Sequence, residues 1–336
     1  MQQPLKKYDI TQCALYKCRS KNRLERLLCL ETGGLRQIHS IIGYHSFEIE
    51  KKHSAEKRKI TAPDKTLKAI QRRILYLLQK VIRPDWLISG EKGKCYIING
   101  KEHKDGRYTL TIDIKKFYDN CTREPVYQFF AKKLKTSPDV AKVLTDIVTY
   151  NAGIPTGCPT SQIIAFYAYF DMFTEIYDMA IAVGCKFTLY VDDMTFSSAT
   201  PFSPQHLTRE IDRILRKYGH KPKYSKVKYY TSSDYKPITG TVVTPNQTLA
   251  VPNGLQKKIY SAFQELKPAI DKPVCSIDEA KQILTLKGQI QAARRIEGEK
   301  FPEILRLTNE IKTPDVDLSH KNGRHSNKYR KRIIIR

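Results

Sequence analysis

Two adjacent aspartates, Asp192 and Asp193, interrupt an otherwise strand-like run, KFTLYVDDMTFSS, at residues 186–198. The residues on both sides of the pair favour strand, so the pattern predicts a hairpin with Asp192 and Asp193 at its two-residue tip. Such a tip would carry both carboxylates to the edge of a sheet, where a cation could reach them. An Asp-Asp pair on its own is more often a solvated turn, because Asp is a common turn residue.

A third carboxylate, Asp113, favours the metal interpretation. It lies near the end of a second predicted strand, Tyr108 to Ile114, well upstream of the pair. Three carboxylates from two neighbouring strands could hold two Mg²⁺ ions about 3.5–4 Å apart for an in-line phosphoryl displacement. Mg²⁺ prefers carboxylate oxygens, water and substrate phosphate, so few protein ligands are expected. Alone, Asp113 could be a strand-end cap; within this set we expect it to bind metal.

Nucleotide transfer would also need a cation for the triphosphate and a close approach for the base and sugar. Arg58, in R-x-I-x-x-P, could clamp phosphate with two hydrogen bonds, although its basic neighbours could do the same. The loop around Gly157 precedes an apolar helix and could offer backbone N–H groups to the nucleotide. Tyr118, five residues after Asp113, could form a wall beside the sugar or could be a core residue.

The composition indicates a polyanionic partner. The 336 residues include 59 Lys and Arg against 34 Asp and Glu, a net charge of +25. Nucleic acid is the first candidate and an acidic membrane surface the second. No apolar run approaches the roughly 20 residues of a spanning helix, and the N-terminal residues lack the apolar core of a signal peptide. Eight cysteines without a C-x-x-C pair indicate neither a disulfide framework nor a zinc cluster, so a reducing cytoplasm is the expected compartment.

Helical and strand-like segments are interspersed without strict alternation, which indicates an α+β fold. The helices expected from apolar periodicity are residues 11–30, the segment from Thr66 to Pro84, residues 121–134 with Thr122 as the cap, residues 162–183, residues 204–218, and most of 253–312. The other expected strands are a basic run at 221–232 and a short hairpin at 235–252.

Several sequence blocks, in order, match a known family. They are R-x-I-x-x-P (58–63), D-I-K-K-F-Y (113–118), I-P-T-G-C-P-T-S (154–161), Y-V-D-D (190–193) and the strand that carries Lys226. This order resembles reverse transcriptases. N-G-K-E-H (99–103) resembles the N-A-x-x-H motif of bacterial retron reverse transcriptases, and I-T-G (238–240) resembles their V-T-G motif. The likeness extends over most of the chain, from near residue 15 to near residue 260. The ordered blocks are specific, whereas either retron motif alone would be weak.

The resemblance implies a right-hand polymerase fold with fingers, palm and helical thumb. It implies that two Mg²⁺ ions are held by Asp113, Asp192, Asp193 and the Ile114 carbonyl, with Lys226 near the leaving pyrophosphate as a candidate general acid. The other implied roles are triphosphate binding by Arg58, a sugar gate at Tyr118, nucleotide contacts by Thr156 and Gly157, and RNA-reading surfaces containing Asn99, His103, Thr239 and Gly240.

Simpler roles remain open for some of these residues. Lys226 lies among other lysines and could contact a backbone phosphate instead. Asn99 and His103 could brace local structure, and Thr239-Gly240 could do no more than shape a hairpin. The chain also departs from the family pattern, with Thr156 in place of the usual Gln, Gln162 for Pro, Gly100 for Ala and Ile238 for Val. The Thr156 difference bears on the nucleotide contact, while the three carboxylates are intact.

The resemblance also suggests an organisation and partners. The expected segments are an N-terminal helical extension (1–47), fingers and palm (48–234), a primer-grip hairpin with a helical thumb (235–316) and a basic tail (317–336). The expected partners are a cognate noncoding RNA that serves as template and primer, dNTPs, the RNA–DNA product and a separate effector protein, with no membrane. Priming from an RNA 2′-hydroxyl would give branched RNA–DNA (msDNA), in anti-phage defence. The alternatives are another class of bacterial reverse transcriptase, or a non-polymerising RNA-binding scaffold for a toxin or effector.

Overall fold

The computed structural model describes residues 7–50 and 57–314, and helices and strands are mixed throughout them. The described strands form three antiparallel sheets of two, four and three strands. The predicted α+β character is therefore confirmed. The basic tail, 317–336, lies outside the described residues.

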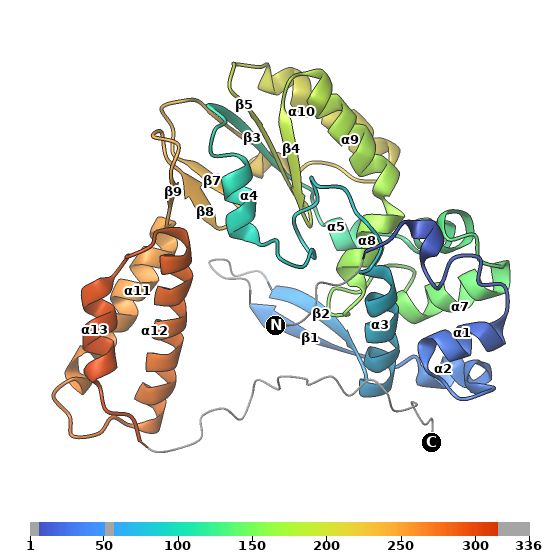
Figure 1. The fold of residues 1–336 in the computed structure, drawn as a ribbon, viewed down its shortest axis with the longest axis horizontal. Coiled ribbons are helices and arrows are strands. Elements are labelled where there is room, and N and C mark those ends of the chain that lie inside the picture. Colours follow the sequence, from blue (N-terminus) through green and yellow to red (C-terminus); the bar gives the residue numbers. More distant parts are fainter. Residues whose placement is uncertain (1–6, 51–56, 315–336) are drawn as a thin grey trace.

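The bounds of the elements follow the chain in Figure 1. The α-helices are α1 (Lys21–Leu28), α2 (Ile38–Ile41), α3 (Lys65–Leu78), α4 (Tyr96–Glu102), α5 (Phe117–Asn120), α6 (Arg123–Gln128), α7 (Pro138–Val148), α8 (Ser161–Ala168), α9 (Phe170–Ala182), α10 (Pro204–Lys217), α11 (Asn253–Leu266), α12 (Ile277–Ile296) and α13 (Pro302–Glu310). The strands are β1 (Tyr44–Glu50), β2 (Lys57–Pro63), β3 (Tyr108–Asp113), β4 (Lys186–Tyr190), β5 (Asp193–Ser198), β6 (Lys228–Tyr230), β7 (Lys236–Ile238), β8 (Thr241–Val243) and β9 (Leu249–Ala250).

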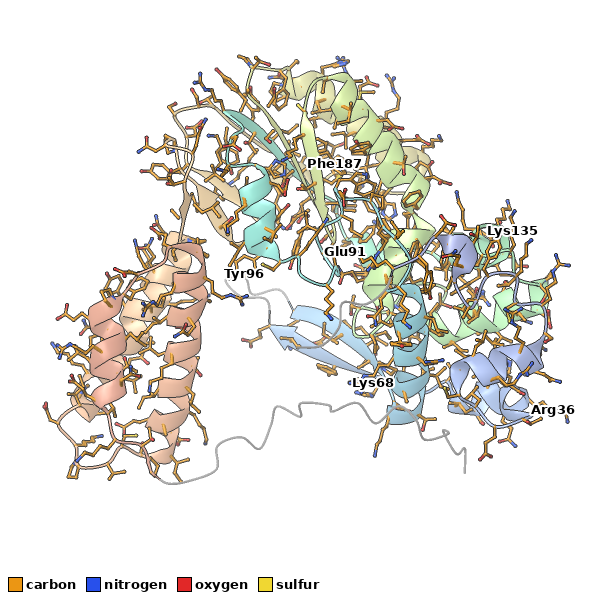
Figure 2. All side chains as sticks on the ribbon, viewed as in Figure 1. Arg36, Lys68, Glu91, Tyr96, Lys135 and Phe187 are labelled. Carbon is orange, nitrogen blue, oxygen red and sulfur yellow. The ribbon has the colours of Figure 1, made fainter. Side chains whose placement is uncertain are left out.

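The four-stranded sheet has the order β4-β5-β3-β6 and lies between helices. Side chains alternate along a strand, and β4 shows the consequence. Phe187 packs against Trp86, with ring centroids 5.6 Å apart, and Trp86 stacks on Tyr177 of α9. The next residue, Thr188, instead hydrogen-bonds to α4 on the opposite face. Figure 2 labels Phe187 among the packed side chains of this layer. The sheet is thus held between α9 and α4.

The β1–β2 hairpin lies beside α3, which follows it in the chain (Figure 1). Its strands pair from Tyr44 opposite Pro63 to Glu50 opposite Lys57. In β1 the side chains after Tyr44 are exposed, Phe47 and Ile49 included. This hairpin therefore contributes little to the core and presents its surface to solvent.

The last three helices have a core of their own. Buried residues from Val251 to Ile311 form one hydrophobic cluster, separate from the large cluster that spans Cys13 to Leu215. Figure 1 shows α11, α12 and α13 packed together as a bundle, apart from the four-stranded sheet. The small β7-β8-β9 sheet precedes this bundle in the chain. The described chain thus has two cores.

Three predicted helices are shorter or interrupted. In the 11–30 segment the α-helix is confined to α1, because Ser20 caps its start and Cys29 ends it in a left-handed conformation. The 162–183 helix is divided at Tyr169, whose hydroxyl bonds the Asn120 carbonyl. The helix from Thr66 ends at Leu78, well before Pro84.

The remaining segments differ from expectation at their edges. Thr122 does occupy the N-cap of α6, but its side chain makes no capping hydrogen bond. The predicted 235–252 hairpin has a third strand, β9. In the basic run at 221–232, regular strand is limited to β6. Within the described residues, no helix is both long and apolar enough to span a membrane.

Candidate active site

Asp113 and Asp193 face each other across neighbouring strands. They are the last residue of β3 and the first of β5, and the antiparallel register pairs them directly. Cβ atoms of directly opposed residues in such a ladder are about 4.5–5.5 Å apart. The prediction that the aspartates converge at one sheet edge is therefore confirmed by the backbone register.

The hairpin tip is shifted by one residue from the prediction. Tyr190 pairs with Asp193, so the two-residue turn is Val191-Asp192 and not Asp192-Asp193. Val191 has φ 62°, a left-handed conformation that is unusual for a β-branched residue. Asp192 therefore lies in the turn, whereas Asp193 is the first residue of β5. The two adjacent aspartates thus have different backbone settings.

Two contacts hold this turn. The Val191 N–H donates to Ser89 Oγ at 2.8 Å, and the Ile114 N–H donates to the Asp192 carbonyl at 3.1 Å. Ser89 is buried. It reaches the turn because Leu87 bridges Leu189 of β4 in parallel. Ser89 was not predicted from the sequence, because no local pattern indicates the long-range pairing of Leu87 with Leu189.

The carboxylates disfavour each other's charge. Partial burial, with the charges of Asp192 and Asp113, raises the pKa of Asp193 to about 7, and protonated Asp193 is within hydrogen-bonding reach of Asp113. Lys226 Nζ lies 2.6 Å from Asp113 Oδ2, although its side chain is 53% exposed. Burial opposes the charge of Lys226, but its hydrogen bond to Asp113 and the nearby aspartates raise its pKa overall.

This donor set suits a hard divalent cation. Burial and the neighbouring carboxylates raise the pKa of Asp193, and the Lys226 ammonium pairs with Asp113, so this sheet edge attracts positive charge. Among the described residues there is no group of three or more His, Cys, Asp or Glu side chains that could hold a metal ion unaided. An ion here would therefore need backbone, water or substrate oxygens as well.

Tyr118 and Arg58 lie on different elements. Tyr118 is half-buried on α5, with its ring 5.4 Å from that of Phe117. Lys116, just before α5, adopts a left-handed conformation that turns the chain after β3. Arg58 belongs to β2, opposite Ile49; its side chain lies outside the described part of the chain. The sugar-gate and triphosphate roles stay predictions.

The 154–161 loop is held by β2. The Gly157 N–H donates to the Thr61 carbonyl at 2.9 Å, and Thr156 Oγ1 donates to the Lys59 carbonyl at 3.2 Å. A Cβ on Gly157 would come within 2.6 Å of the Thr61 oxygen. The expectation that Gly157 offers its N–H and its open space to a nucleotide is therefore wrong here, because the β2 backbone takes both.

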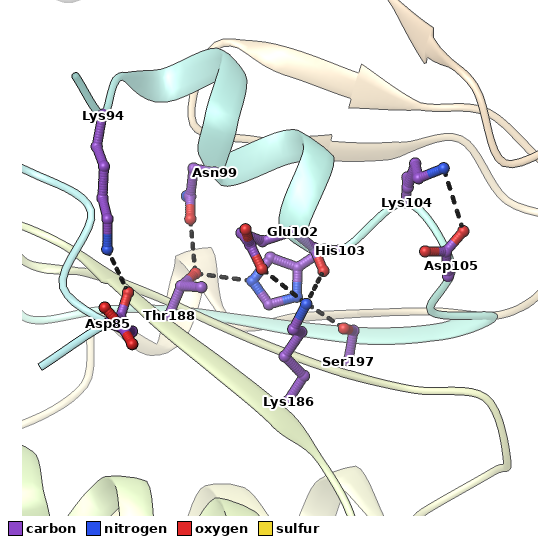
Figure 3. Close-up of polar contacts among 10 residues, drawn as sticks. All are labelled: Asp85, Lys94, Asn99, Glu102, His103, Lys104, Asp105, Lys186, Thr188 and Ser197. Carbon is purple, nitrogen blue, oxygen red and sulfur yellow. Dashed lines mark hydrogen bonds and ion pairs between the residues drawn. The ribbon is translucent and has the colours of Figure 1, made fainter.

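Asn99 and His103 are fully buried, which contradicts their predicted place on an RNA-reading surface. Asn99 lies within α4 and His103 directly follows its last residue, and both face β4 and β5 (Figure 3). His103 contacts Thr188 Oγ1 through Nε2 and Ser197 Oγ through Nδ1, each at 2.7 Å. Burial lowers the pKa of His103 to about 3, so the ring is neutral.

The hydrogen bonds around His103 and Thr188 allow one consistent assignment of donors and acceptors. Thr188 donates to Asn99 Oδ1 at 2.6 Å, so its oxygen accepts from His103 Nε2–H. A neutral His103 then accepts from Ser197 at Nδ1. Asn99 Nδ2 donates to Thr239 Oγ1 at 2.9 Å. A continuous chain of hydrogen bonds thus runs from β5 through α4 to the β7–β8 turn.

That turn borders the aspartates. Thr239 and Gly240 connect β7 to β8 with φ of 40° and 84°, as a two-residue hairpin turn requires. The hairpin-shaping role of these two residues is confirmed. Thr239 also lines a cavity of about 160 Å³ together with Asp113, Asp193 and Lys226. Thr188 and Ser197, which complete the hydrogen-bond chain to Thr239, were not singled out from the sequence.

The cysteines near the site are packing residues, as expected. Burial raises the pKa of Cys158 and of Cys185 to about 11. A thiol with such a pKa stays protonated near neutral pH, so neither is primed as a nucleophile.

Comparison with known proteins identifies the family of this chain. Residues 49–292 match the family model described as reverse transcriptase (RNA-dependent DNA polymerase). The chain is 30% identical over 174 residues to a retron Se72 reverse transcriptase from Salmonella heidelberg, which is 52% of this chain and 46% of that protein. It is 24% identical over 241 residues to a retron Ec48 reverse transcriptase from Escherichia coli (70% and 59%), and 29% identical over 157 residues to a retron Ec86 reverse transcriptase from the same species (46% and 49%).

These matches confirm the resemblance to retron reverse transcriptases. The aligned segments span about half the length of these curated relatives, between 46% and 59%.

Proposed function

This chain belongs to the reverse transcriptase (RNA-dependent DNA polymerase) family, and from that premise we propose that it copies part of a structured noncoding RNA into single-stranded DNA as a retron-type enzyme. The observation that carries the proposal is the register that sets Asp113 directly opposite Asp193, next to the Asp192 turn. Similarity to the Se72, Ec48 and Ec86 retron enzymes supports the subtype.

We propose that Asp113, Asp192 and Asp193, with the Ile114 carbonyl, hold two Mg²⁺ ions. Such ions, when bound, activate the attacking hydroxyl and stabilise the leaving pyrophosphate. The aspartates would gather the reacting oxygens at the sheet edge. Lys226, which pairs with Asp113, would lie near the leaving pyrophosphate as a candidate general acid. Thr239 would form the facing wall of the cavity.

The architecture fits a right-hand polymerase. In this proposal the β1–β2 hairpin and its neighbouring helices are the fingers, the four-stranded sheet is the palm, and the α11–α13 bundle is the thumb. The boundaries 1–47, 48–234 and 235–316 stay part of the proposal; the two cores, which divide between Leu215 and Val251, support only the separation of the last segment. The β7–β8 hairpin would hold the primer end beside the aspartates.

We propose a bracing role for Asn99 and His103 in place of direct RNA contact. Both side chains are fully buried, and they connect the aspartate-bearing hairpin to the β7–β8 turn. Thr239 and Gly240, which keep some exposure, remain candidates for contact with the nucleic acid. Buried, fully bonded polar groups can fix one arrangement of neighbouring elements.

The finer biology is proposed from the family resemblance. It comprises priming from an RNA 2′-hydroxyl to give branched msDNA, action in the bacterial cytoplasm in anti-phage defence, and a separate effector protein as partner. The net charge of +25 supports an RNA and DNA partner.

The test is to express the chain together with its adjacent transcribed upstream region and to extract nucleic acid. We expect a short single-stranded DNA that changes size after RNase and debranching treatment. Asp113→Asn and Asp193→Asn should abolish this DNA, because both remove a carboxylate from the proposed metal site. Asp105→Asn, whose side chain is 77% exposed, is the matched control and should leave the DNA unchanged.

Each outcome separates one hypothesis from another. DNA that lacks a branch would keep the polymerase and exclude the retron priming. RNA that copurifies equally with every variant, with no DNA from any of them, would support the scaffold alternative. DNA that persists in both aspartate variants would refute the assigned carboxylates.

A further inference from the structure

Lys236 is a buried cation without a bonding partner. It opens β7 and is 1% exposed, one of the largest fully buried side chains in the described chain. Its backbone pairs with Val243. Within residues 7–50 and 57–314, its ammonium group makes neither a hydrogen bond nor an ion pair. Burying an isolated ammonium is costly, so this position needs an explanation.

Asp234, the acidic residue that acts on Lys236 electrostatically, does not provide one. Asp234 influences Lys236 electrostatically, but burial outweighs that influence and lowers the pKa of Lys236. The Asp234 carboxylate is instead occupied at Thr231, whose N–H and Oγ1 donate to Oδ2 at 2.7 and 2.8 Å. The charge of Lys236 is therefore only partly compensated.

Lys236 lines a polar cavity of about 300 Å³. The other lining residues are Arg107, Ser232, Pro245, Asn246 and Gln247. They supply a guanidinium, a hydroxyl and two amide groups, all of which can donate hydrogen bonds, and no carboxylate lines the cavity. Two cations with these donors match the oxygens of a phosphate group. The volume is at the lower end for small-molecule sites.

The cavity lies away from the aspartates. Arg107 immediately precedes β3, whereas Asp113 is the last residue of that strand. At about 3.4 Å per residue, the two ends of β3 are roughly 17 Å apart. The cavity is therefore distinct from the one that Thr239 shares with Asp113 and Asp193.

We propose that the Lys236 cavity is a phosphate-binding site, with Lys236 and Arg107 as the charged donors and Ser232, Asn246 and Gln247 completing it. The phosphate belongs either to the backbone of a bound nucleic acid or to a free phosphate or nucleotide. A bound phosphate supplies the counter-charge that Lys236 lacks in the protein alone. This site stands independently of the polymerase activity, because it rests on a different set of residues.

The test uses the full chain and the Lys236→Met variant, whose side chain has similar length without charge. Two probes are titrated calorimetrically: inorganic phosphate against chloride at equal ionic strength, and a short oligothymidylate. We expect Lys236→Met to weaken at least one probe about tenfold, the loss of one charge-assisted contact. Without probe, its melting temperature should stay the same or rise by a few degrees, because an unpaired buried charge is gone.

Two further variants keep the test decisive. Arg107→Gln changes an exposed side chain, so it should fold normally and weaken the same probe even if Lys236→Met does not fold. Lys217→Met, the matched control, removes the last lysine of α10, which is paired with Glu175 of α9, and should leave phosphate affinity unchanged. Loss of phosphate binding would identify a free phosphate ligand, and loss of oligonucleotide binding alone would identify a backbone phosphate. Unchanged affinity for both probes in Lys236→Met and Arg107→Gln would overturn the proposal.

Discussion

At the scale of residues, the turn that contains Asp192 is held by Ser89, which comes from a distant segment of the chain. Asp113, Asp192 and Asp193 were identified because their chemistry needs that residue type near strand ends. Ser89 was not, because its contact with the Val191 N–H depends on a bridge between Leu87 and Leu189 that is remote in sequence. The one-residue shift of the hairpin turn, from Asp192-Asp193 to Val191-Asp192, has a similar cause. Strand propensity cannot predict a left-handed Val191.

His220 gives a prediction at the residue scale. Among the residues that the structure describes, neither ring nitrogen has a hydrogen-bond partner, and the ring packs 4.6 Å from that of Tyr169 and 5.3 Å from that of Phe117. An unsatisfied buried polar group costs about 1–3 kcal/mol. We expect His220→Phe to raise the free energy of unfolding at pH 7.5 by about 1 kcal/mol, or to leave it unchanged, as measured by urea denaturation. A clear loss of stability would contradict the assignment of His220 as an unsatisfied group.

The same residue has a pH signature. Burial lowers the pKa of His220 to about 4, and it lowers that of His103 to about 3. The unfolded chain binds these protons below about pH 6.5, whereas the folded chain excludes them. The stability from both rings is therefore complete above pH 6.5 and declines as pH falls towards 4, by up to about 1.4 kcal/mol per pH unit for each ring. Urea denaturation at pH 7.5 and 5.0 should show a smaller loss of unfolding free energy in His220→Phe than in the unaltered protein. In His206→Gln, which changes an exposed histidine, this loss should equal that of the unaltered protein.

At the scale of elements, the packing of α4 brings two weak sequence motifs, N-G-K-E-H (99–103) and I-T-G (238–240), into contact. Gly100 packs where a Cβ would come within 2.3 Å of Thr241 Oγ1, so α4 lies directly on β8. Asn99 then reaches Thr239 in the turn before β8. From the sequence, Asn99 and His103 are polar residues in a polar stretch and are expected at the surface. Their burial results from the packing of α4 between the four-stranded sheet and the β7-β8-β9 sheet. Local periodicity in the sequence does not predict this packing.

The Asn99–Thr239 contact can be tested by changing one hydroxyl. Thr239→Val keeps the shape but removes the acceptor for Asn99 Nδ2, whereas Thr239→Ser keeps the acceptor. If the turn positions the primer end, Thr239→Val should lower the rate of first-nucleotide addition about tenfold, the effect of losing one hydrogen bond to a buried group. The KM for dNTP should stay unchanged, and Thr239→Ser should restore the rate. Equal rates for the Val and Ser variants would show that the contact has no positioning role, even if thermal stability differs.

At the scale of the molecule, the two cores predict two unfolding units. The bundle is built from residues 251–311, and its buried side chains form a cluster separate from the one around the four-stranded sheet. A unit of roughly 60 residues buries only about 60% of its unfolded surface and is marginal alone. The family resemblance predicts a helical thumb within 235–316, but periodicity alone does not predict that these helices form a core of their own, because it identifies apolar faces and not which face packs on which neighbour.

Two matched substitutions should separate these units. Leu286 in α12 and Leu144 in α7 are both fully buried, one in each core. Leu→Ala at such a site costs about 2–5 kcal/mol. We expect Leu286→Ala to accelerate amide hydrogen exchange throughout α11–α13 and to leave the protected amides of α7 and the four-stranded sheet unchanged. Leu144→Ala should accelerate exchange around α7 and also in the bundle, if the bundle depends on the larger core for its anchorage. Acceleration of all regions by Leu286→Ala would instead mean that the bundle and the sheet unfold as one cooperative unit.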